Sequence, residues 1–105
     1  MKRLCVAILS LVLAGCAGSN ADRWTKPGVK AETAEADLSD CEDQARSATR
    51  RDAGIDADIM ASRGGDWQRA GTLAVKRDDM ANSSRAFGQQ IIGRCMAARG
   101  YRPVQ

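Results

Sequence analysis

The sequence predicts an all-α fold, a small domain built as three helices or as a helical hairpin. Apolar residues recur every three or four positions in two long segments, residues 31–51 and 84–99, which is the spacing of one helix face. Stretches rich in Gly or Ser separate the helical segments. No segment alternates apolar and polar residues as a half-buried strand does.

The first helix is predicted over residues 31–51. Its apolar residues share one face, and acidic residues lie early and basic ones late, which suits the helix dipole. Gly54 is the predicted stop. The residues of the apolar face are Ala34, Leu38, Cys41, Ala45 and Ala48.

A middle helix is predicted over residues 66–81. Gly64-Gly65 is expected to break the chain, and Asp66 is a suitable N-cap for the helix that follows. Trp67 is expected to anchor the core from this helix. In this interpretation the middle segment covers the far end of the domain.

The last helix is predicted over residues 84–99, capped by the polar residues 82–84. Gly100 stands where the left-handed residue after a helix belongs, so Tyr101 is expected to fold back onto the domain. The predicted inward residues are Phe87, Ile91, Cys95 and Ala98.

The composition offers little for catalysis. The 105 residues include no histidine, which removes Ser-His and Cys-His pairs and most zinc geometries. Adjacent carboxylates such as Asp78-Asp79 point apart on a helix. We therefore expect a protein that is not an enzyme and that uses no metal or cofactor.

The first sixteen residues form a pattern of their own. Basic residues 2–3 precede an apolar run over residues 4–13, which is too short to span a membrane, and Leu13-Ala14-Gly15-Cys16 ends it. This segment resembles a bacterial lipoprotein signal peptide. The resemblance implies cleavage before Cys16 and a fatty acyl anchor, such as palmitate, on its sulfur. The alternative is ordinary cleavage after Ala17, which gives a soluble periplasmic protein.

This assignment divides the chain into a signal peptide (1–15), a lipidated N-terminus and flexible tether (16–30) and the helical domain (31–103). In lipoproteins of this type an Asp after the cysteine favours the inner membrane, so Ala17 favours the periplasmic face of the outer membrane. The expected partner is then the lipid bilayer, through acylated Cys16. The signal holds two of the 16 basic residues and none of the 13 acidic ones, which leaves a net charge of +1. A chain this close to neutral has no electrostatic basis for binding nucleic acid.

The four cysteines are not equivalent. Cys5 leaves with the signal and Cys16 is acylated, so Cys41 and Cys95 remain in an oxidising compartment. We expect them to form a structural disulfide, since no C-x-x-C motif and no histidine supports a redox-active or metal-bound pair. In an antiparallel pair of the first and last helices, the two cysteines fall at the same level.

Three further motifs occur together: Trp24-Thr25-Lys26-Pro27-Gly28, Asp37-Leu38-Ser39-Asp40-Cys41 and Cys95-Met96-Ala97-Ala98-Arg99-Gly100-Tyr101. They resemble a widespread group of small bacterial lipoproteins with no established activity, which carry W-x-K-P-G, D-x-x-x-C and a terminal C-M-x-x-[KR]-G-[YW]. The resemblance implies an envelope location and a paired cysteine. The chain departs from the group at Lys30, where a Thr or Ser helix cap is common, and in its longer middle segment, residues 53–83.

The expected function is a non-enzymatic structural or interaction role in the bacterial envelope. Arg99, Tyr101 and Arg102 are candidate contact residues for another envelope protein or for peptidoglycan. The alternative for Tyr101 is packing onto the Cys95 bridge or the first helix. A second interpretation is an accessory or surface-exclusion lipoprotein of a secretion or conjugation system.

Overall fold

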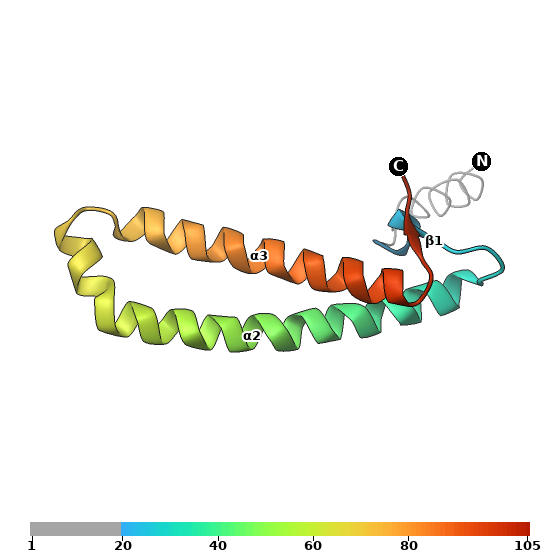
Figure 1. Ribbon diagram of the computed structural model, residues 1–105, viewed down its shortest axis with the longest axis horizontal. Helices are drawn as coiled ribbons and strands as arrows, with labels where there is room; N and C mark the ends of the chain where they lie inside the picture. Colours follow the sequence, from blue (N-terminus) through green and yellow to red (C-terminus); the bar gives the residue numbers. More distant parts are fainter. Residues whose placement is uncertain (1–19) are drawn as a thin grey trace, which may run out of the picture.

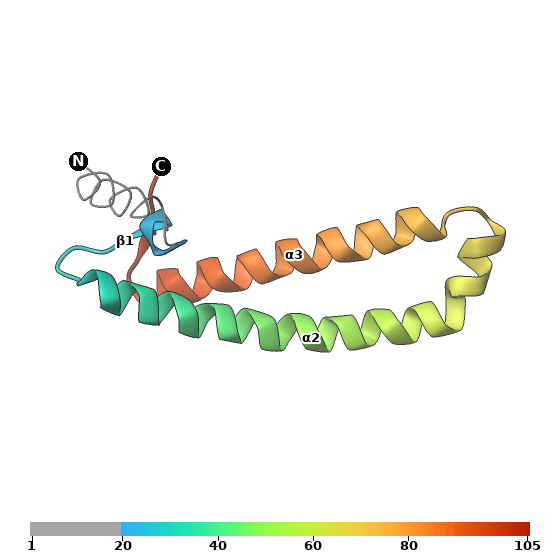
Figure 2. The same cartoon turned by 180° about the vertical axis from the view of Figure 1, so that it is seen from behind.

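The structure, a computed structural model, describes residues 20–105 and consists of a long antiparallel helical hairpin. Short N- and C-terminal segments gather at the end where the first helix begins and the second ends, which we call the base (Figures 1 and 2). The all-α prediction is confirmed in its hairpin form. The elements are η1 (Asn20–Arg23), β1 (Trp24–Thr25), α2 (Ala31–Arg69), α3 (Leu73–Ala98) and β2 (Arg102–Pro103).

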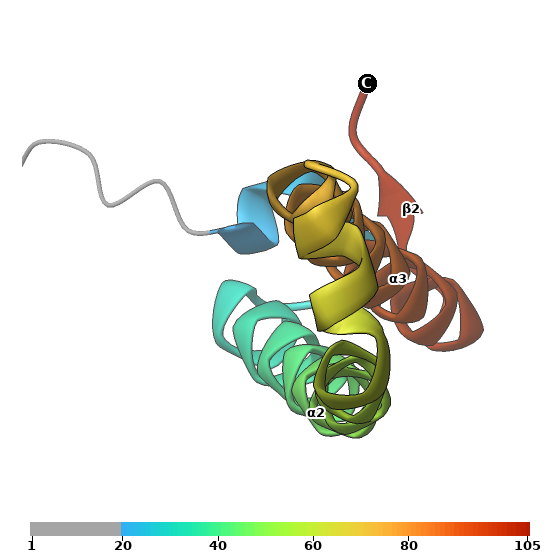
Figure 3. The ribbon, with the colours of Figure 1, turned by 90° about the vertical axis from the view of Figure 1, so that its left-hand side faces the viewer.

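The hairpin is long for its mass. The 39 residues of α2 and the 26 residues of α3 correspond to about 58 Å and about 39 Å of helix. Seen along the hairpin from its tip, the last turns of α2 cross toward the axis of α3 (Figure 3). None of the helices in residues 20–105 combines the length and the apolar character that a membrane span requires.

The three-helix alternative is wrong, because the expected breaks lie inside helices. Gly54 and Gly64-Gly65 are interior residues of α2, and Asp66 pairs with Arg69 instead of capping a new helix. Residues 82–84 are interior to α3. An interior glycine costs a helix only about 1 kcal/mol relative to alanine, so it does not by itself end one.

The helices end where glycine adopts a left-handed backbone. At Gly71 (φ +72°) the amide of Thr72 donates to the Trp67 carbonyl, and the Gly71 amide donates to that of Gln68. Gly100 (φ +89°) closes α3 in the same Schellman pattern, with Tyr101 donating to the Met96 carbonyl. The expected role of Gly100 is therefore confirmed, whereas the break at Gly71 was not predicted.

The core lies entirely at the base. Its buried members are Ala21, Leu38, Cys41, Met96 and Tyr101. They come from the N-terminal segment, α2, α3 and the C-terminal segment, so every part of the chain in the base contributes.

The predicted inward residues are right for α2 near the base and for Cys95 of α3, which packs against the core, and wrong in part elsewhere. Leu38, Cys41 and Ala45 of α2 are buried, but the buried residues of α3 are Gly88 and Met96. A Cβ atom added at Gly88 would lie 3.4 Å from Thr49 Cγ2, at van der Waals contact, so the two helices lie close together there. The predicted residues Phe87 and Ala98 are exposed, and Trp67 is only half-buried and stands outside the core.

The N-terminal segment is part of the folded base from Asn20 onward, although residues 20–30 were assigned to the tether. Trp24 pairs with Pro103 and Thr25 with Arg102 in a two-residue antiparallel ladder, and the Val104 amide donates to the Arg23 carbonyl at 2.8 Å. So short a ladder leaves no alternating pattern in the sequence, which is why no strand was predicted.

Candidate functional site

A disulfide between Cys41 and Cys95 joins α2 to α3 in the base, as the sequence predicts, with a Cα–Cα distance of 5.6 Å. Cys41 is fully buried, and Met96, the residue after Cys95, is also fully buried. The bridge therefore lies inside the core, where it fixes the level at which the two helices pack.

A polar cluster borders this bridge and centres on Asp37 of α2. The Tyr101 hydroxyl donates to Asp37 Oδ2 at 2.7 Å, and Arg99 Nη1 donates to Asp37 Oδ1 at 2.7 Å. Arg99 also reaches Asp40 Oδ2 at 3.4 Å. Because both oxygens of Asp37 are bound, the C-terminal segment is held on α2 by two charge-assisted hydrogen bonds.

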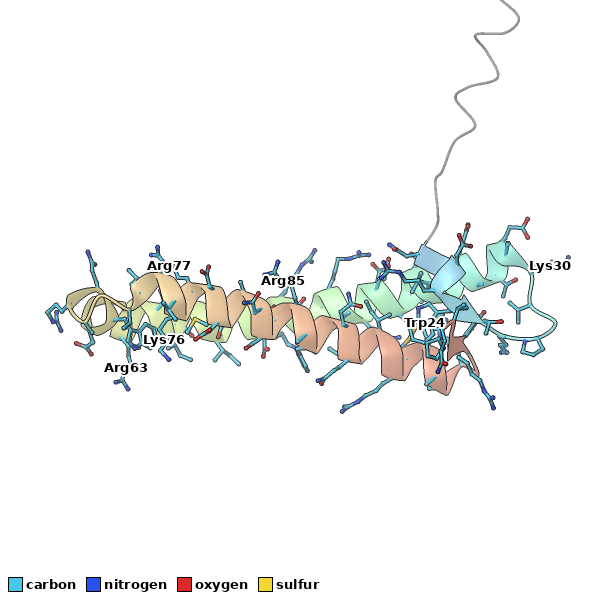
Figure 4. All side chains as sticks on the ribbon, turned by 90° about the horizontal axis from the view of Figure 1, so that it is seen from above. Trp24, Lys30, Arg63, Lys76, Arg77 and Arg85 are labelled. Carbon is cyan, nitrogen blue, oxygen red and sulfur yellow. A yellow bond between two sulfur atoms is a disulfide. The ribbon has the colours of Figure 1, made fainter. Side chains whose placement is uncertain are left out.

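Lys26 joins the N-terminal segment to the same cluster. Its Nζ donates to the Arg99 carbonyl at 2.7 Å and lies 5.3 Å from the centre of the Tyr101 ring, within reach of a cation–π interaction. The turn that aims Lys26 this way passes through Pro27 and Gly28, whose φ of +77° suits glycine. Figure 4 shows Trp24 among the side chains crowded at this end of the molecule.

The cluster stabilises one protonation state of each member. The hydrogen bond from Tyr101, followed by the hydrogen bond and charge of Arg99, lowers the pKa of Asp37, although partial burial opposes this shift. The hydrogen bond to Asp37 and burial raise the pKa of Tyr101, and the bond to Asp37 raises that of Arg99. At neutral pH the carboxylate is thus held ionised and the phenol protonated.

These pKa shifts suit a cluster that holds chain segments together. A general base or acid works best with a pKa near the operating pH, and here each pKa moves away from neutrality. The Tyr101 side chain is also covered, with 3 % of its surface exposed. In residues 20–105, no three Asp, Glu or Cys side chains are grouped as metal ligands would be.

The three candidate contact residues lie in different environments. Tyr101 packs on α2 and is too buried to form a contact surface, which corrects its assignment as a contact residue and bears out the packing alternative. Arg99 is half-buried in the same cluster, where its guanidinium group pairs with Asp37 of the same chain. Arg102 is exposed on β2 and stays a candidate. The lipidation site, Cys16, lies outside the described residues.

Sequence reasoning missed the contacts of Lys26 and Asp37. Each of the three sequence motifs contributes to the cluster: Lys26 from the first, Asp37 and Cys41 from the second, and the Cys95–Tyr101 segment from the third. The joint occurrence of the motifs was therefore the available signal that they meet in space.

No protein-family model matches this chain, and no curated protein or solved structure matches it either.

Proposed function

We propose that this chain is a bacterial envelope lipoprotein, acylated at Cys16, whose helical hairpin is a non-enzymatic interaction module. The observation that carries the proposal is the sequence Leu13-Ala14-Gly15-Cys16 after a short apolar run. The folded base starts at Asn20, so only residues 17–19 would separate the acylated Cys16 from the domain. The four Cα–Cα steps from Cys16 to Asn20 span at most about 14 Å, so the anchor would hold the base close to the bilayer.

The shape of the hairpin supports a role in contact. With its base at the membrane, α2 would carry most of its about 58 Å of helix away from the bilayer before its last turns bend toward α3. The charged cluster at the base is occupied in joining three chain segments, and its pKa shifts oppose acid–base catalysis. We therefore assign the exposed part of the hairpin to contact with another envelope component, either a protein or peptidoglycan.

The anchor is tested by the intact mass of the protein extracted from cells. The wild-type chain is expected to begin at Cys16 and to carry acyl chains, and C16S is expected to lose both the acyl mass and membrane association. C5S is the matched control, since Cys5 leaves with the signal, and it should behave as the wild type. An unacylated chain that begins at Gly18 would instead show ordinary cleavage and a soluble periplasmic protein.

The outer-membrane location has its own test. We expect the wild-type protein in the outer-membrane fraction of a density gradient and A17D in the inner-membrane fraction. If the wild type already sediments with the inner membrane, the proposed location is wrong while the anchor stands.

The interaction role is tested by crosslinking in intact cells followed by affinity purification. A specific crosslinked product, to a protein or to peptidoglycan fragments, is the expected result. Recovery of the uncrosslinked chain alone, under conditions that crosslink a known envelope complex, would contradict the role.

A further inference from the structure

The outer part of the hairpin, residues 46–87, which we call the arm, contains no buried residue although the structure describes all of it. Large apolar side chains are nevertheless frequent there, and Ile55 and Val75 are 58 % and 60 % exposed. Helices in proteins gain most of their stability from packing an apolar face, so this arm leaves apolar surface uncovered. The half-buried apolar residues of the arm include Ile59, Met60, Trp67, Leu73 and Met80.

The contact between the two helices is weak within the arm. Asp52 and Asp56 are half-buried and line a cavity of about 310 Å³ between α2 and α3. At the base, by contrast, apolar residues fill the space between the two helices. Neither carboxylate has a hydrogen-bond or ion-pair partner among residues 20–105. Carboxylates therefore line the space between these two parts of the arm helices.

Two half-buried apolar residues, one from each helix, border this cavity. Ile59 and Met80 both line it. Ile55 lies one turn before Ile59 on α2, and Phe87, which is 37 % exposed, lies two turns after Met80 on α3, so each shares a side with its partner. We call the surface made by Ile55, Ile59, Met80 and Phe87 the arm face.

We propose that a second copy of this chain covers the arm face, so that two hairpins form a four-helix bundle. Two hairpins packed face to face would build the shared apolar core that such bundles have and that the single arm lacks. The symmetric contact requires a surface that complements itself. The cavity lining carries one cation, Lys76, and three carboxylates, Asp52, Asp56 and Asp79, so each copy offers both members of one ion pair.

The size and charge of the arm also suit a second copy. Residues 46–69 of α2 contain about 36 Å of helix, and two helices are about 20 Å wide, so the footprint is at most roughly 700 Å², because the last turns of α2 bend. A standard stable interface buries about 800 Å² on each partner. The arm has eight basic and six acidic residues, so two copies repel each other little and no strongly charged partner is favoured. Figure 4 shows Arg63 and Arg77 projecting from different sides of the arm.

The pairing goes beyond the proposed function and does not depend on it. A chain that is never acylated could still pair through the arm, and an acylated chain could remain single. The two proposals therefore fail independently, because the first is read from the mass of the chain and the second from its association.

The first test uses the full chain in cells with a photo-crosslinking phenylalanine analogue at position 87. We expect a crosslinked product of twice the chain's mass whose peptides all come from this chain. The matched control carries the analogue at Ala61, an exposed position two residues after Ile59 and so on the opposite side of α2. It should give no such product.

The second test measures association of the purified chain by light scattering. I55K places a charge on the arm face at a position that the single chain already exposes, so the hairpin should keep its circular dichroism spectrum. The dissociation constant of the dimer is expected to rise at least tenfold, because one buried isoleucine is lost from each copy. A61K adds the same charge on the opposite side and should leave the dimer unchanged.

Three results would overturn the pairing. The wild-type chain could remain monomeric at every concentration tested, the analogue at position 87 could crosslink only to a different protein, or A61K could weaken the dimer as much as I55K does.

Discussion

At the scale of single residues, Tyr101 contributes both an apolar contact and a hydrogen bond to the base. Its ring is buried in the core, and its hydroxyl donates to Asp37 Oδ2 at 2.7 Å. The same carboxylate accepts a hydrogen bond from Arg99 on its other oxygen. The bond from Tyr101 is the largest cause of the lowered pKa of Asp37, and the bond to Asp37 is the largest cause of the raised pKa of Tyr101.

These two shifts predict that stability falls at both ends of the pH range. A carboxyl whose pKa is lower in the folded chain adds stability above its ordinary value, about 4, and that stability is lost as the pH falls through the folded pKa. A phenol whose pKa is higher in the folded chain adds stability below about 10, and that stability is lost as the pH rises through its folded pKa. The urea midpoint should therefore decline in acid and in strong alkali.

Asp37→Asn should flatten both declines and lower the midpoint at neutral pH, measured by urea unfolding from acid to alkaline pH. Asp43→Asn is the matched control, because Asp43 pairs with Arg46 on the exposed surface of the same helix and does not touch Tyr101. If Asp37→Asn kept the full wild-type dependence on pH, the contacts of Asp37 would not be the source of the two declines.

At the scale of elements, helix ends depend on conformations that residue type alone does not specify. Gly100 was correctly predicted as a helix end because Tyr101, which follows it, can return to the core. Gly54 and Gly64 have the same residue type but continue α2, whereas Gly71 adopts the left-handed conformation and ends it. Thr72 and Leu73 after Gly71, a cap-type residue followed by an apolar one, were the weak local signal of that turn.

The first turn of α2 lacks a side-chain cap, which predicts that Lys30→Ser stabilises the domain. Lys30 has the extended backbone of an N-cap residue, and its carbonyl accepts the Ala34 amide at 3.1 Å, but its side chain caps no amide. A serine hydroxyl could accept the amide of Glu32 or Thr33. We expect the free energy of unfolding to rise by about 1 kcal/mol in urea denaturation.

Lys30→Ala serves as the control for this prediction. Alanine removes the positive charge from the helix N-terminus, where it is unfavourable, but offers no acceptor. An equal gain from alanine and serine would assign the effect to the charge and would contradict a gain from capping.

At the scale of the whole molecule, the sequence predicted the disulfide better than it predicted the packing of the base. The pairing of Cys41 with Cys95 followed from the cysteines that remain once Cys5 and Cys16 are assigned to the predicted signal and anchor, and an antiparallel pair of helices was consistent with that pairing. The base could not be assembled in the same way. Its contacts join residues 20–29 to residues 99–104 through a two-residue backbone ladder and single side chains such as Lys26, and such contacts leave no periodic trace in a sequence.

The length of the loop that the disulfide closes predicts how much the bridge contributes to the stability of the fold. Cys41 and Cys95 are separated by 54 positions, and closing a loop of this length stabilises a fold by about 4 kcal/mol in the chain-entropy model. A small domain has about 5–15 kcal/mol in all, and here the only buried core lies around the bridge in the base of the described chain.

The double variant C41A/C95A should therefore lose about 4 kcal/mol, a large part of its stability, with a clear fall in the urea midpoint. The wild-type chain treated with a thiol reductant should reach the same midpoint, because both changes open the same loop. Without reductant, Cys41 and Cys95 of the wild type should resist alkylation even in urea. A double variant that unfolds within about 1 kcal/mol of the wild type would mean that the hydrophobic and polar contacts of the base suffice to hold the hairpin together.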